Sequence, residues 1–333
     1  MNYADNDCML SVIIPVYNSE KTLRKTVDSV LDAQIENMEL VLVDDGSTDN
    51  SASICDEYAE NNRLFTVIHQ RNAGISAARN VGMANAKGTY CFFLDSDDTV
   101  RKNLFECFIN YLTLHDASPD VVAFDVQKLH AVTGETFPIG LQPLGENIDG
   151  LDGVSAVKAI LQTDPKYEWY AWRYFYSTEF LNKHQFRFLE GFYYEDVEWT
   201  PRVLLKASLF GYMPVLGINY LYQNSSSILN TPSLKRYQDK AEISDRMIRY
   251  VDQNVPDKQL CLLLKSNFSS LYLSAVGGYL RGLSVLYHSL FQRKHILRYA
   301  NTRFSRVLYL LCRVFGFRFG CLLTRMIIKA RNI

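Results

Sequence analysis

The stretch FFLDSDDT, residues 92–99, runs from three apolar residues directly into three carboxylates within four positions. Carboxylates this close repel one another, and each loses hydration at the end of a buried strand. A bound cation compensates for such crowding, and hard carboxylate oxygens suit Mg²⁺ or Mn²⁺. The stretch therefore favours a divalent metal held by Asp95 and Asp97, with Asp98 as an alternative ligand. A D-x-D motif alone is weak evidence, because an acidic loop is often only solvated.

Short apolar runs alternate with helical patterns on the N-terminal side of this stretch. The runs predict buried strands, and the periodic segments between them predict helices. The predicted strands are 11–18, 65–69, 89–94 and the first part of 39–50, which breaks into a glycine-containing acidic turn. The predicted helices follow Ser19 and cover 51–60 and 75–86. This alternation predicts parallel strands and an α/β sheet with helices on both faces.

Polar residues stand at the ends of three of the predicted strands. Tyr17 and Asn18 stand at the end of the first strand, Asp44 and Asp45 at the end of the second, and the D-S-D-D run at the end of the fourth. Ligands of open α/β sheets bind at the carboxyl ends of the strands. The three ends therefore predict one binding edge. Separately, Ser19 is expected to be the N-cap of the helix that follows the first strand.

Glycine-rich phosphate loops are absent from the expected places. No G-x-G-x-x-G follows the first strand, and GMANAKGT (82–89) has Lys and Gly in the wrong order for a P-loop. A nucleotidyltransferase would be expected to carry a glycine-rich basic loop where PVYNSEKT (15–22) stands. Phosphates, if bound, are therefore expected on a metal.

Three segments between residues 10 and 100 resemble the successive signatures of family 2 glycosyltransferases. They are VIIPVYN with Glu20 two residues on, LVLVDDGSTDNS, and RNAGISAARNVGMANAKGTYCFFLDSDD. The resemblance implies the GT-A fold, a Rossmann-like mixed sheet with helices on both faces, followed here by a C-terminal helical segment. It also implies inverting transfer from a nucleotide-diphosphate sugar, with UDP favoured, and a divalent metal cofactor, Mn²⁺ or Mg²⁺. The expected acceptor is a glycan or lipid-linked molecule of surface polysaccharide biosynthesis.

The resemblance assigns the nucleoside side of the site to two strand ends. Pro15, Tyr17 and Glu20 match the positions around the nucleoside, and Asp45 matches the acid that accepts a hydrogen bond from the base. Packing is the alternative role for Tyr17. An Asx turn is the alternative at Asp44, with Asp45 facing the ligand.

The resemblance places the sugar and metal beside the fourth strand. Arg79 matches a basic contact near the donor, although pairing with an acidic loop would explain it equally well. Asp95 and Ser96 match positions near the ribose and sugar. Asp97 matches the metal ligand, a role that Asp98 could share.

The segment GFYYEDVEW (191–199) resembles the signature that supplies the catalytic base. An inverting transfer is a single displacement, so a base must take the proton of the acceptor hydroxyl. The resemblance favours Asp196, with Glu195 as the alternate. Both carboxylates would equally suit a helix N-terminus. The chain's tryptophans, Trp169, Trp172 and Trp199, are expected in the core more than as sugar platforms.

Charge is distributed unevenly along the chain. The net charge is −1, which gives no sign of a nucleic-acid partner, but no Asp or Glu follows Asp257 and thirteen Lys and Arg do. Residues 291–333 interleave these cations with bulky apolar residues, and Gly316 and Gly320 are expected to interrupt the helix there. The tail suits an interfacial segment on an anionic membrane, or a packed helix pair with a solvated basic side.

The domain organisation and location follow from these observations. Residues 1–115 are expected to form the nucleotide-sugar half, 116–228 the acceptor half with the base, and 229–333 a helical basic region. Seven cysteines without metal spacing, no signal peptide and no eighteen-residue apolar run predict a cytoplasmic protein, peripheral on the inner face of the membrane. Two alternatives remain: a nucleotidyltransferase, or a non-catalytic protein that binds sugar nucleotides or glycans.

Overall fold

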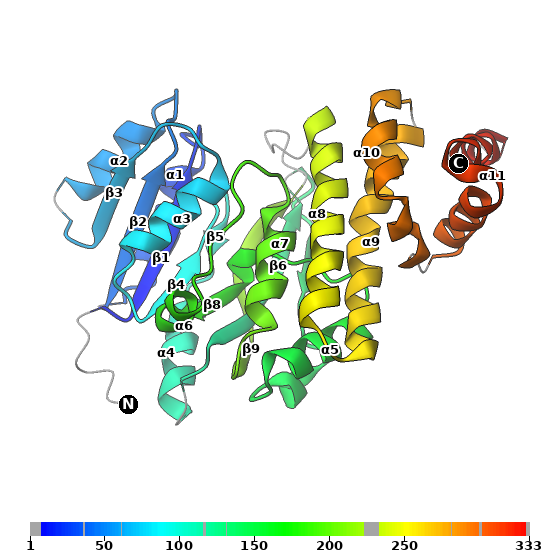
Figure 1. The fold of residues 1–333 in the computed structure, drawn as a ribbon. Helices are drawn as coiled ribbons and strands as arrows, with labels where there is room; N and C mark the ends of the chain where they lie inside the picture. Colours follow the sequence, from blue (N-terminus) through cyan, green and yellow to red (C-terminus); the bar gives the residue numbers. More distant parts are fainter. Residues whose placement is uncertain are drawn as a thin grey trace. The chain divides into compact units, whose positions relative to one another are not determined.

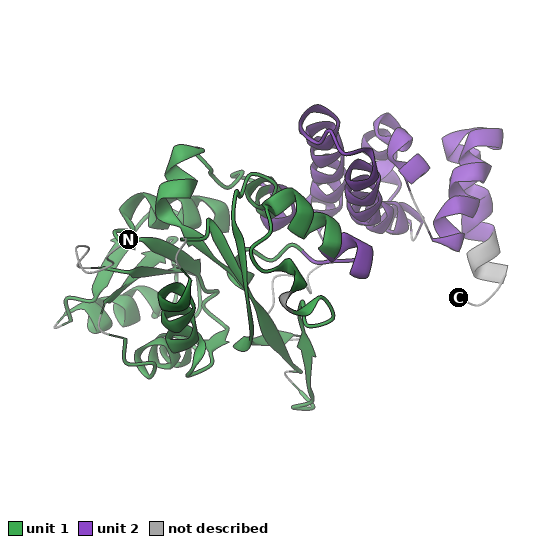
Figure 2. Ribbon diagram, turned by 90° about the horizontal axis from the view of Figure 1, so that it is seen from below, with its two compact units in different colours: residues 1–159, 169–191, 199–230 green, residues 160–168, 192–198, 231–333 purple. Residues whose placement is uncertain are grey.

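The computed structural model describes residues 8–330, apart from 36, 61, 116, 117, 131, 223–232, 281, 300 and 301. It divides into two compact units, coloured separately in Figure 2. Unit 1 holds residues 1–159, 169–191 and 199–230, and unit 2 holds 160–168, 192–198 and 231–333. The boundaries expected at 115/116 and 228/229 touch residues outside the described part.

A single mixed sheet forms the centre of unit 1 (Figure 1). Its strand order is β3-β2-β1-β4-β8-β6-β9-β5, with β7 paired to β6. The strands are β1 (Leu10–Val16), β2 (Met38–Asp44), β3 (Phe65–His69), β4 (Tyr90–Phe93), β5 (Thr99–Val100), β6 (Val121–His130), β7 (Thr136–Ile139), β8 (Tyr174–Ser177) and β9 (Phe210–Tyr222).

The half of the sheet built from β1 to β4 is parallel, as the alternating pattern predicts. Every residue of β1 and β2 is buried, because both strands lie inside the sheet with neighbours on either side. Its helices are α1 (Leu23–Leu31), α2 (Ser51–Ala59) and α3 (Ile75–Asn85). The mixed α/β architecture expected of a GT-A fold is confirmed.

The other half of the sheet is mixed and strongly aromatic. β8 pairs antiparallel with both β4 and β6, while β9 runs parallel to β6. Phe175 of β8 stacks on Phe108, with ring centroids 3.9 Å apart. The shorter elements here are α4 (Leu104–Leu114), η2 (Gly145–Ile148), α5 (Gly153–Thr163), η3 (Ala171–Arg173), α6 (Thr178–Lys183) and α7 (Glu195–Leu204). Buried aromatic rings in mutual contact therefore form much of the core of this half.

Unit 2 is helical over its C-terminal stretch, as predicted. It contains α8 (Leu234–Asn254), α9 (Lys258–Leu280), η5 (Ser284–Leu286), α10 (Tyr287–Gln292), η6 (Lys294–Tyr299) and α11 (Arg303–Ala330). α8 and α9 pack side by side, and the buried Ser244 hydroxyl donates to the Phe268 carbonyl across them.

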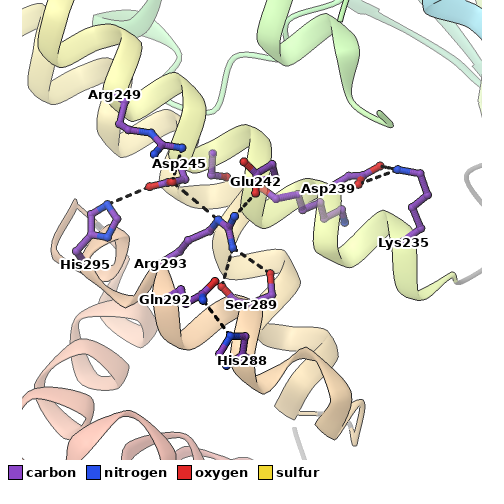
Figure 3. A network of polar contacts seen from close by, with 12 residues as sticks. Lys235, Asp239, Glu242, Asp245, Arg249, His288, Ser289, Gln292, Arg293 and His295 are labelled. Carbon is purple, nitrogen blue, oxygen red and sulfur yellow. Dashed lines mark hydrogen bonds and ion pairs between the residues drawn. The ribbon is translucent and has the colours of Figure 1, made fainter. Parts of the chain in front are cut away.

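A network of charged side chains fixes α10 and η6 to α8 (Figure 3). Arg293 pairs with Glu242 and lies 3.9 Å from Asp245. His295 and Arg249 also contact the Asp245 carboxylate, at 3.2 and 2.8 Å. Because Asp245 is buried, these partners offset the desolvation of its carboxylate.

Candidate functional site

The D-S-D-D stretch forms a tight turn at the carboxyl end of β4. The Asp98 amide donates to the Asp95 carbonyl at 3.1 Å and closes the turn. The Ser96 hydroxyl lies 2.7 Å from the Ser19 hydroxyl, and the Ser96 carbonyl accepts from Thr26. The turn is therefore fixed to the segment that follows β1. The predicted capping role of Ser19 is wrong: α1 has Thr22 as its N-cap residue, without a side-chain cap, because the Ser19 hydroxyl is engaged with Ser96.

The carboxylates of this turn have different surroundings. Asp95 Oδ1 accepts from Arg79 Nη2 at 2.8 Å. Asp97 is partly buried and makes no side-chain hydrogen bond with any residue of the described chain. Burial, with the nearby Asp95 charge as a smaller cause, raises the pKa of Asp97 to about 6. Repulsion and desolvation therefore remain uncompensated at Asp97, as the crowded sequence suggested.

Asp98 is drawn away from the surface. It is 1% exposed, and its Oδ1 accepts the Leu221 amide of β9 at 3.0 Å. Burial raises the pKa of Asp98 well above its ordinary range. Its Oδ2 is buried without a hydrogen-bond partner among the described residues. One oxygen of Asp98 therefore secures β9, which leaves Asp95 and Asp97 as the more accessible pair.

These carboxylates fit a divalent metal that completes its shell with substrate. Mg²⁺ is usually held by one or two carboxylates together with phosphate oxygens and water. Within the described chain, no group of three or more His, Cys, Asp or Glu side chains is arranged to hold a metal by itself. The partly buried carboxylate of Asp97 and the neighbouring carboxylate of Asp95 are the donor set that such a shared shell needs.

Arg79 lies in a buried position on α3, 1% exposed. Its guanidinium carbon is 5.2 Å from the ring centroid of Phe188, which itself stacks on Trp199 at 4.2 Å. The Asn80 side chain bonds both the amide and the carbonyl of Phe188. Pairing with the acidic turn, one of the two roles expected for Arg79, is therefore what the structure shows. The sequence gives no local signal for the contact between Asn80 and Phe188, because the two residues are 108 positions apart.

The end of β2 orders the next loop. Asp44 Oδ1 accepts the Ser47 amide at 3.0 Å, so the turn predicted there is confirmed. Asp45 is 3% exposed and accepts hydrogen bonds from Gln70, Ala73 and Gly74, each at 2.7–2.8 Å. Asp45 therefore braces the loop between β3 and α3.

Gly46 allows this close approach of two loops. Its φ is +69°, a left-handed conformation that glycine adopts without strain. A Cβ at this position would lie 2.8 Å from the Asn72 amide nitrogen and 3.2 Å from the Gln70 carbonyl oxygen. A larger residue would push the Asp45-bound loop away.

The end of β1 presents an exposed aromatic ring. Tyr17 is 44% exposed, so packing does not explain it. Glu20 Oε2 accepts from both the backbone and the side chain of Asn50, at 3.2 and 3.0 Å. Pro15 is buried within β1 opposite Val43, where it shapes the strand end without reaching the surface. Tyr17 is thus the residue of this group that is open to a ligand.

The ends of β1, β2 and β4 meet, as predicted from their polar residues. Asn18 donates its amide to Ser47, and the Asp45 amide donates to the Val16 carbonyl. The Ser19–Ser96 contact joins the same segment to the D-S-D-D turn. Unit 1 therefore gathers the predicted donor-side residues at one edge of its sheet.

Glu195 and Asp196 form the first turn of α7 and belong to unit 2. Tyr194, immediately before them, has a φ of +67°, an uncommon conformation for a tyrosine. Glu198 in the same helix is buried and paired with Arg246 at 2.9 Å. The three tryptophans are at most 3% exposed, which confirms them as core residues.

Comparison with known proteins shows which glycosyltransferases this chain is similar to. Residues 11–145 match the family model "Glycosyl transferase family 2". The uncharacterized glycosyltransferase YibD of Escherichia coli K12 is 29% identical over 259 residues, which cover 75% of this chain and 72% of YibD. The minor teichoic acid biosynthesis protein GgaB of Bacillus subtilis is 39% identical over 140 residues, 40% of this chain but 15% of GgaB.

A solved structure matches nearly the whole chain. TarS 1-349 of S. aureus, crystallised in complex with UDP-GlcNAc, aligns with a TM-score of 0.74 over 97% of this chain and 92% of its own. The two sequences are 18% identical, so the likeness concerns the fold. It extends beyond the sheet into the helical C-terminal region.

Proposed function

We propose, from the premise that this chain is a family 2 glycosyltransferase of the GT-A fold, that it moves a sugar with inversion from a UDP-sugar to a surface glycan or its lipid-linked precursor. The observation that carries the proposal is the edge where β1, β2 and β4 end. An exposed Tyr17, a braced Asp45 loop and the Asp95–Asp97 pair lie there together.

The donor side is assigned to residues of unit 1. Tyr17 and Asp45 are proposed to contact the nucleoside, with Pro15 and Glu20 shaping the strand end and the neighbouring turn. A UDP-sugar is favoured because the TarS neighbour was crystallised with UDP-GlcNAc. Ser96 and Asp95 are proposed beside the ribose and sugar, and Arg79 positions Asp95.

Asp97 and Asp95 are proposed to hold a divalent metal, with Asp98 in a supporting place through its remaining oxygen. When bound, such a metal acts as a Lewis acid for the departing diphosphate. The residues themselves orient the donor: Arg79 holds Asp95, and Ser19 holds the turn through Ser96.

Asp196 is proposed as the general base, with Glu195 as the alternate. One carboxylate oxygen would take the proton of the acceptor hydroxyl as that oxygen attacks the anomeric carbon. Trp199 anchors the continuation of α7 within unit 1, edge-on to Phe93 at 5.7 Å.

The biological setting is proposed from the relatives' names. GgaB is a minor teichoic acid biosynthesis protein, and this chain resembles part of it. An acceptor of the cell surface, made on the cytoplasmic side of the membrane, follows as the proposed substrate class. The donor sugar and the linkage are left to experiment.

A thermal-shift panel of nucleotides and nucleotide sugars, with and without Mn²⁺, tests this proposal. Stabilisation by UDP or a UDP-sugar only with metal, lost in Asp97→Ala, is the expected result; a ligand at one hundred times its Kd adds about 2.7 kcal/mol. Stabilisation by nucleoside triphosphates with release of pyrophosphate would instead indicate a nucleotidyltransferase. UDP-sugar binding without any hydrolysis or transfer, in wild type as in Asp196→Asn, would indicate a binding protein.

A further inference from the structure

Helix α11 consists of two short helices joined by a sharp break. Gly316 has φ +78° and ψ +160°, which breaks the helix between residues 303–315 and 317–330. A Cβ on Gly320 would lie 2.5 Å from the Cys312 backbone nitrogen, so the halves are in backbone contact. We call this pair the α11 hairpin; it is the red segment at the C-terminal end in Figure 1.

The hairpin has one packed face. Its second half inserts Phe317, 3% exposed, among the rings of Tyr279, Tyr287 and Phe291, with centroids 6.1–6.5 Å apart. The other buried residues of the hairpin face inward too: Ser305, Leu308, Gly320, Cys321 and Thr324. Through Tyr287 and Phe291 the hairpin rests on α10, which the Arg293 network ties to α8 (Figure 3). The hairpin is therefore held firmly by one side.

The opposite side is apolar and exposed. Of the eighteen large hydrophobic residues that are exposed in the described chain, eight lie in the hairpin. Val314 and Phe319 are 70% and 63% exposed. On a helical wheel at 100° per residue, the exposed hydrophobic residues of the second half lie in one arc, opposite the buried residues of that half. The full set is Phe304, Val307, Leu310, Val314, Phe315, Phe319, Leu322 and Met326. Exposed apolar residues gathered on one side of a helix in this way mark an interaction site.

The charges of the hairpin have a single sign. Residues 303–326 contain five arginines and no Asp or Glu, and the five are Arg303, Arg306, Arg313, Arg318 and Arg325. None of the five forms an ion pair with a residue that the structure describes, whereas the acids of α8 are paired within their own network. In the second half, Arg318 and Arg325 stand at the border of the apolar arc. A partner must therefore offer both apolar and anionic surface.

The fold of the hairpin limits how deep it can enter a membrane. By length and composition alone, Lys258–Leu280 and Arg303–Met326 are each long and apolar enough to span one. Half of the first is buried inside the protein, where α9 packs on α8. The second is broken at Gly316, so each half is roughly 20 Å long, and a hydrocarbon core is about 30 Å thick. Neither half reaches across.

We propose that the α11 hairpin docks the protein on an anionic lipid membrane by lying in its interface. The apolar arc enters the boundary between headgroups and acyl chains, and the arginines contact the anionic headgroups. Basic amphipathic helices bind in this way, by buried apolar area together with charge attraction. The inference is independent of glycosyl transfer, since it concerns unit 2 alone and needs no donor.

Flotation of the full chain with lipid vesicles tests the proposal. Wild type is expected to float with phosphatidylcholine vesicles that contain phosphatidylglycerol, and far less with phosphatidylcholine alone. The triple change Phe315→Ser, Phe319→Ser, Leu322→Ser should abolish flotation. Arg313→Gln, Arg318→Gln, Arg325→Gln should weaken partition at least tenfold and remove the lipid-charge dependence. The matched control is Leu262→Ser, because Leu262 is 62% exposed on α9 outside the hairpin and should leave flotation unchanged.

Several outcomes would overturn the proposal. If wild type binds neither vesicle but forms a dimer that the triple serine change dissociates, a second copy of the chain covers the arc. Membrane-bound protein that resists extraction at high pH would show that the segment spans. If Leu262→Ser lost as much flotation as the triple serine variant, the hairpin would not be the membrane-binding surface. UDP binding by each variant, measured in the same preparations, reports whether unit 1 is intact.

Discussion

Replacing Asp97 with asparagine is expected to stabilise the free protein while it abolishes metal-dependent donor binding. The folded-state pKa of about 6 lies above the ordinary 3.8, so the ionised side chain is disfavoured on folding. Each pKa unit of that difference corresponds to about 1.4 kcal/mol. Above pH 6 the ionised Asp97 therefore lowers the free energy of unfolding by about 3 kcal/mol. Asparagine has nearly the same shape and carries no charge, so it removes this cost.

The sign of the effect depends on pH. Below pH 3.8 the carboxyl is protonated in both folded and unfolded chains, and the two proteins should be equally stable. As the pH rises through 3.8 to about 6, wild type loses stability relative to Asp97→Asn, and the difference then stays constant. At roughly 2 °C per kcal/mol, the melting temperature of the variant should exceed that of wild type by about 6 °C at pH 8.

Thermal melting at pH 4.5 and pH 8, without and with UDP and Mn²⁺, measures both parts of the prediction. Asp32→Asn is the matched control, because Asp32 is exposed and the same change there should alter neither quantity. A variant that is less stable than wild type at both pH values would refute the reasoning, since Asp97 would then have a structural partner. Retained UDP and Mn²⁺ stabilisation would refute its role as a ligand.

Three further predictions follow from other residues. Asp196→Asn should lower kcat about a thousandfold and leave the Kd of the donor unchanged, as rapid-quench and thermal-shift assays would show; a lower affinity with normal kcat would contradict a base role. His69→Asn should destabilise the protein more at pH 5.5 than at pH 9, because the Asp44 hydrogen bond raises the pKa of His69 and the resulting stability is lost as the pH rises through it. Equal destabilisation at both pH values would argue against this. Gly320→Leu should separate the halves of α11, because even a Cβ lies 2.5 Å from the Cys312 backbone; faster hydrogen exchange confined to residues 303–326 is expected, and unchanged exchange would show that the halves do not depend on this contact.

The parallel half of the sheet was predictable because its signals are local. Apolar runs with helical segments between them lead to β1–β4, and residues 65–69 form β3 as expected. The Asp44 turn was equally predictable, because aspartate side chains in glycine-containing turns accept hydrogen bonds from backbone amides just ahead of them, here that of Ser47. The break at Gly316 also follows from the sequence, whereas Gly320 serves as a contact between helices and not as an interruption.

Contacts between distant segments were beyond such reasoning. No residue near Arg79 in the sequence predicts its contact with Phe188. The hydrogen bond from the Leu221 amide to Asp98 depends on how β9 enters the sheet. The D-S-D-D run therefore predicted charge crowding but not its division into one structural carboxylate and two accessible ones. The exposure of Tyr17 likewise depends on the neighbouring turns, which the pattern of apolar residues does not describe.

The bracing of residues 70–74 by Asp45 has a practical consequence for protein engineering. Ala73 and Gly74 are held through their backbone amides, so these anchoring bonds do not depend on the side chain at position 73. A library that varies Arg71, Asn72 and Ala73 while keeping Asp45 and Gly46 would explore new chemistry on an unchanged frame. Under the proposed function, such a library tests whether this loop sets nucleotide preference, since diversity is confined to one loop and the scaffold that carries it is preserved.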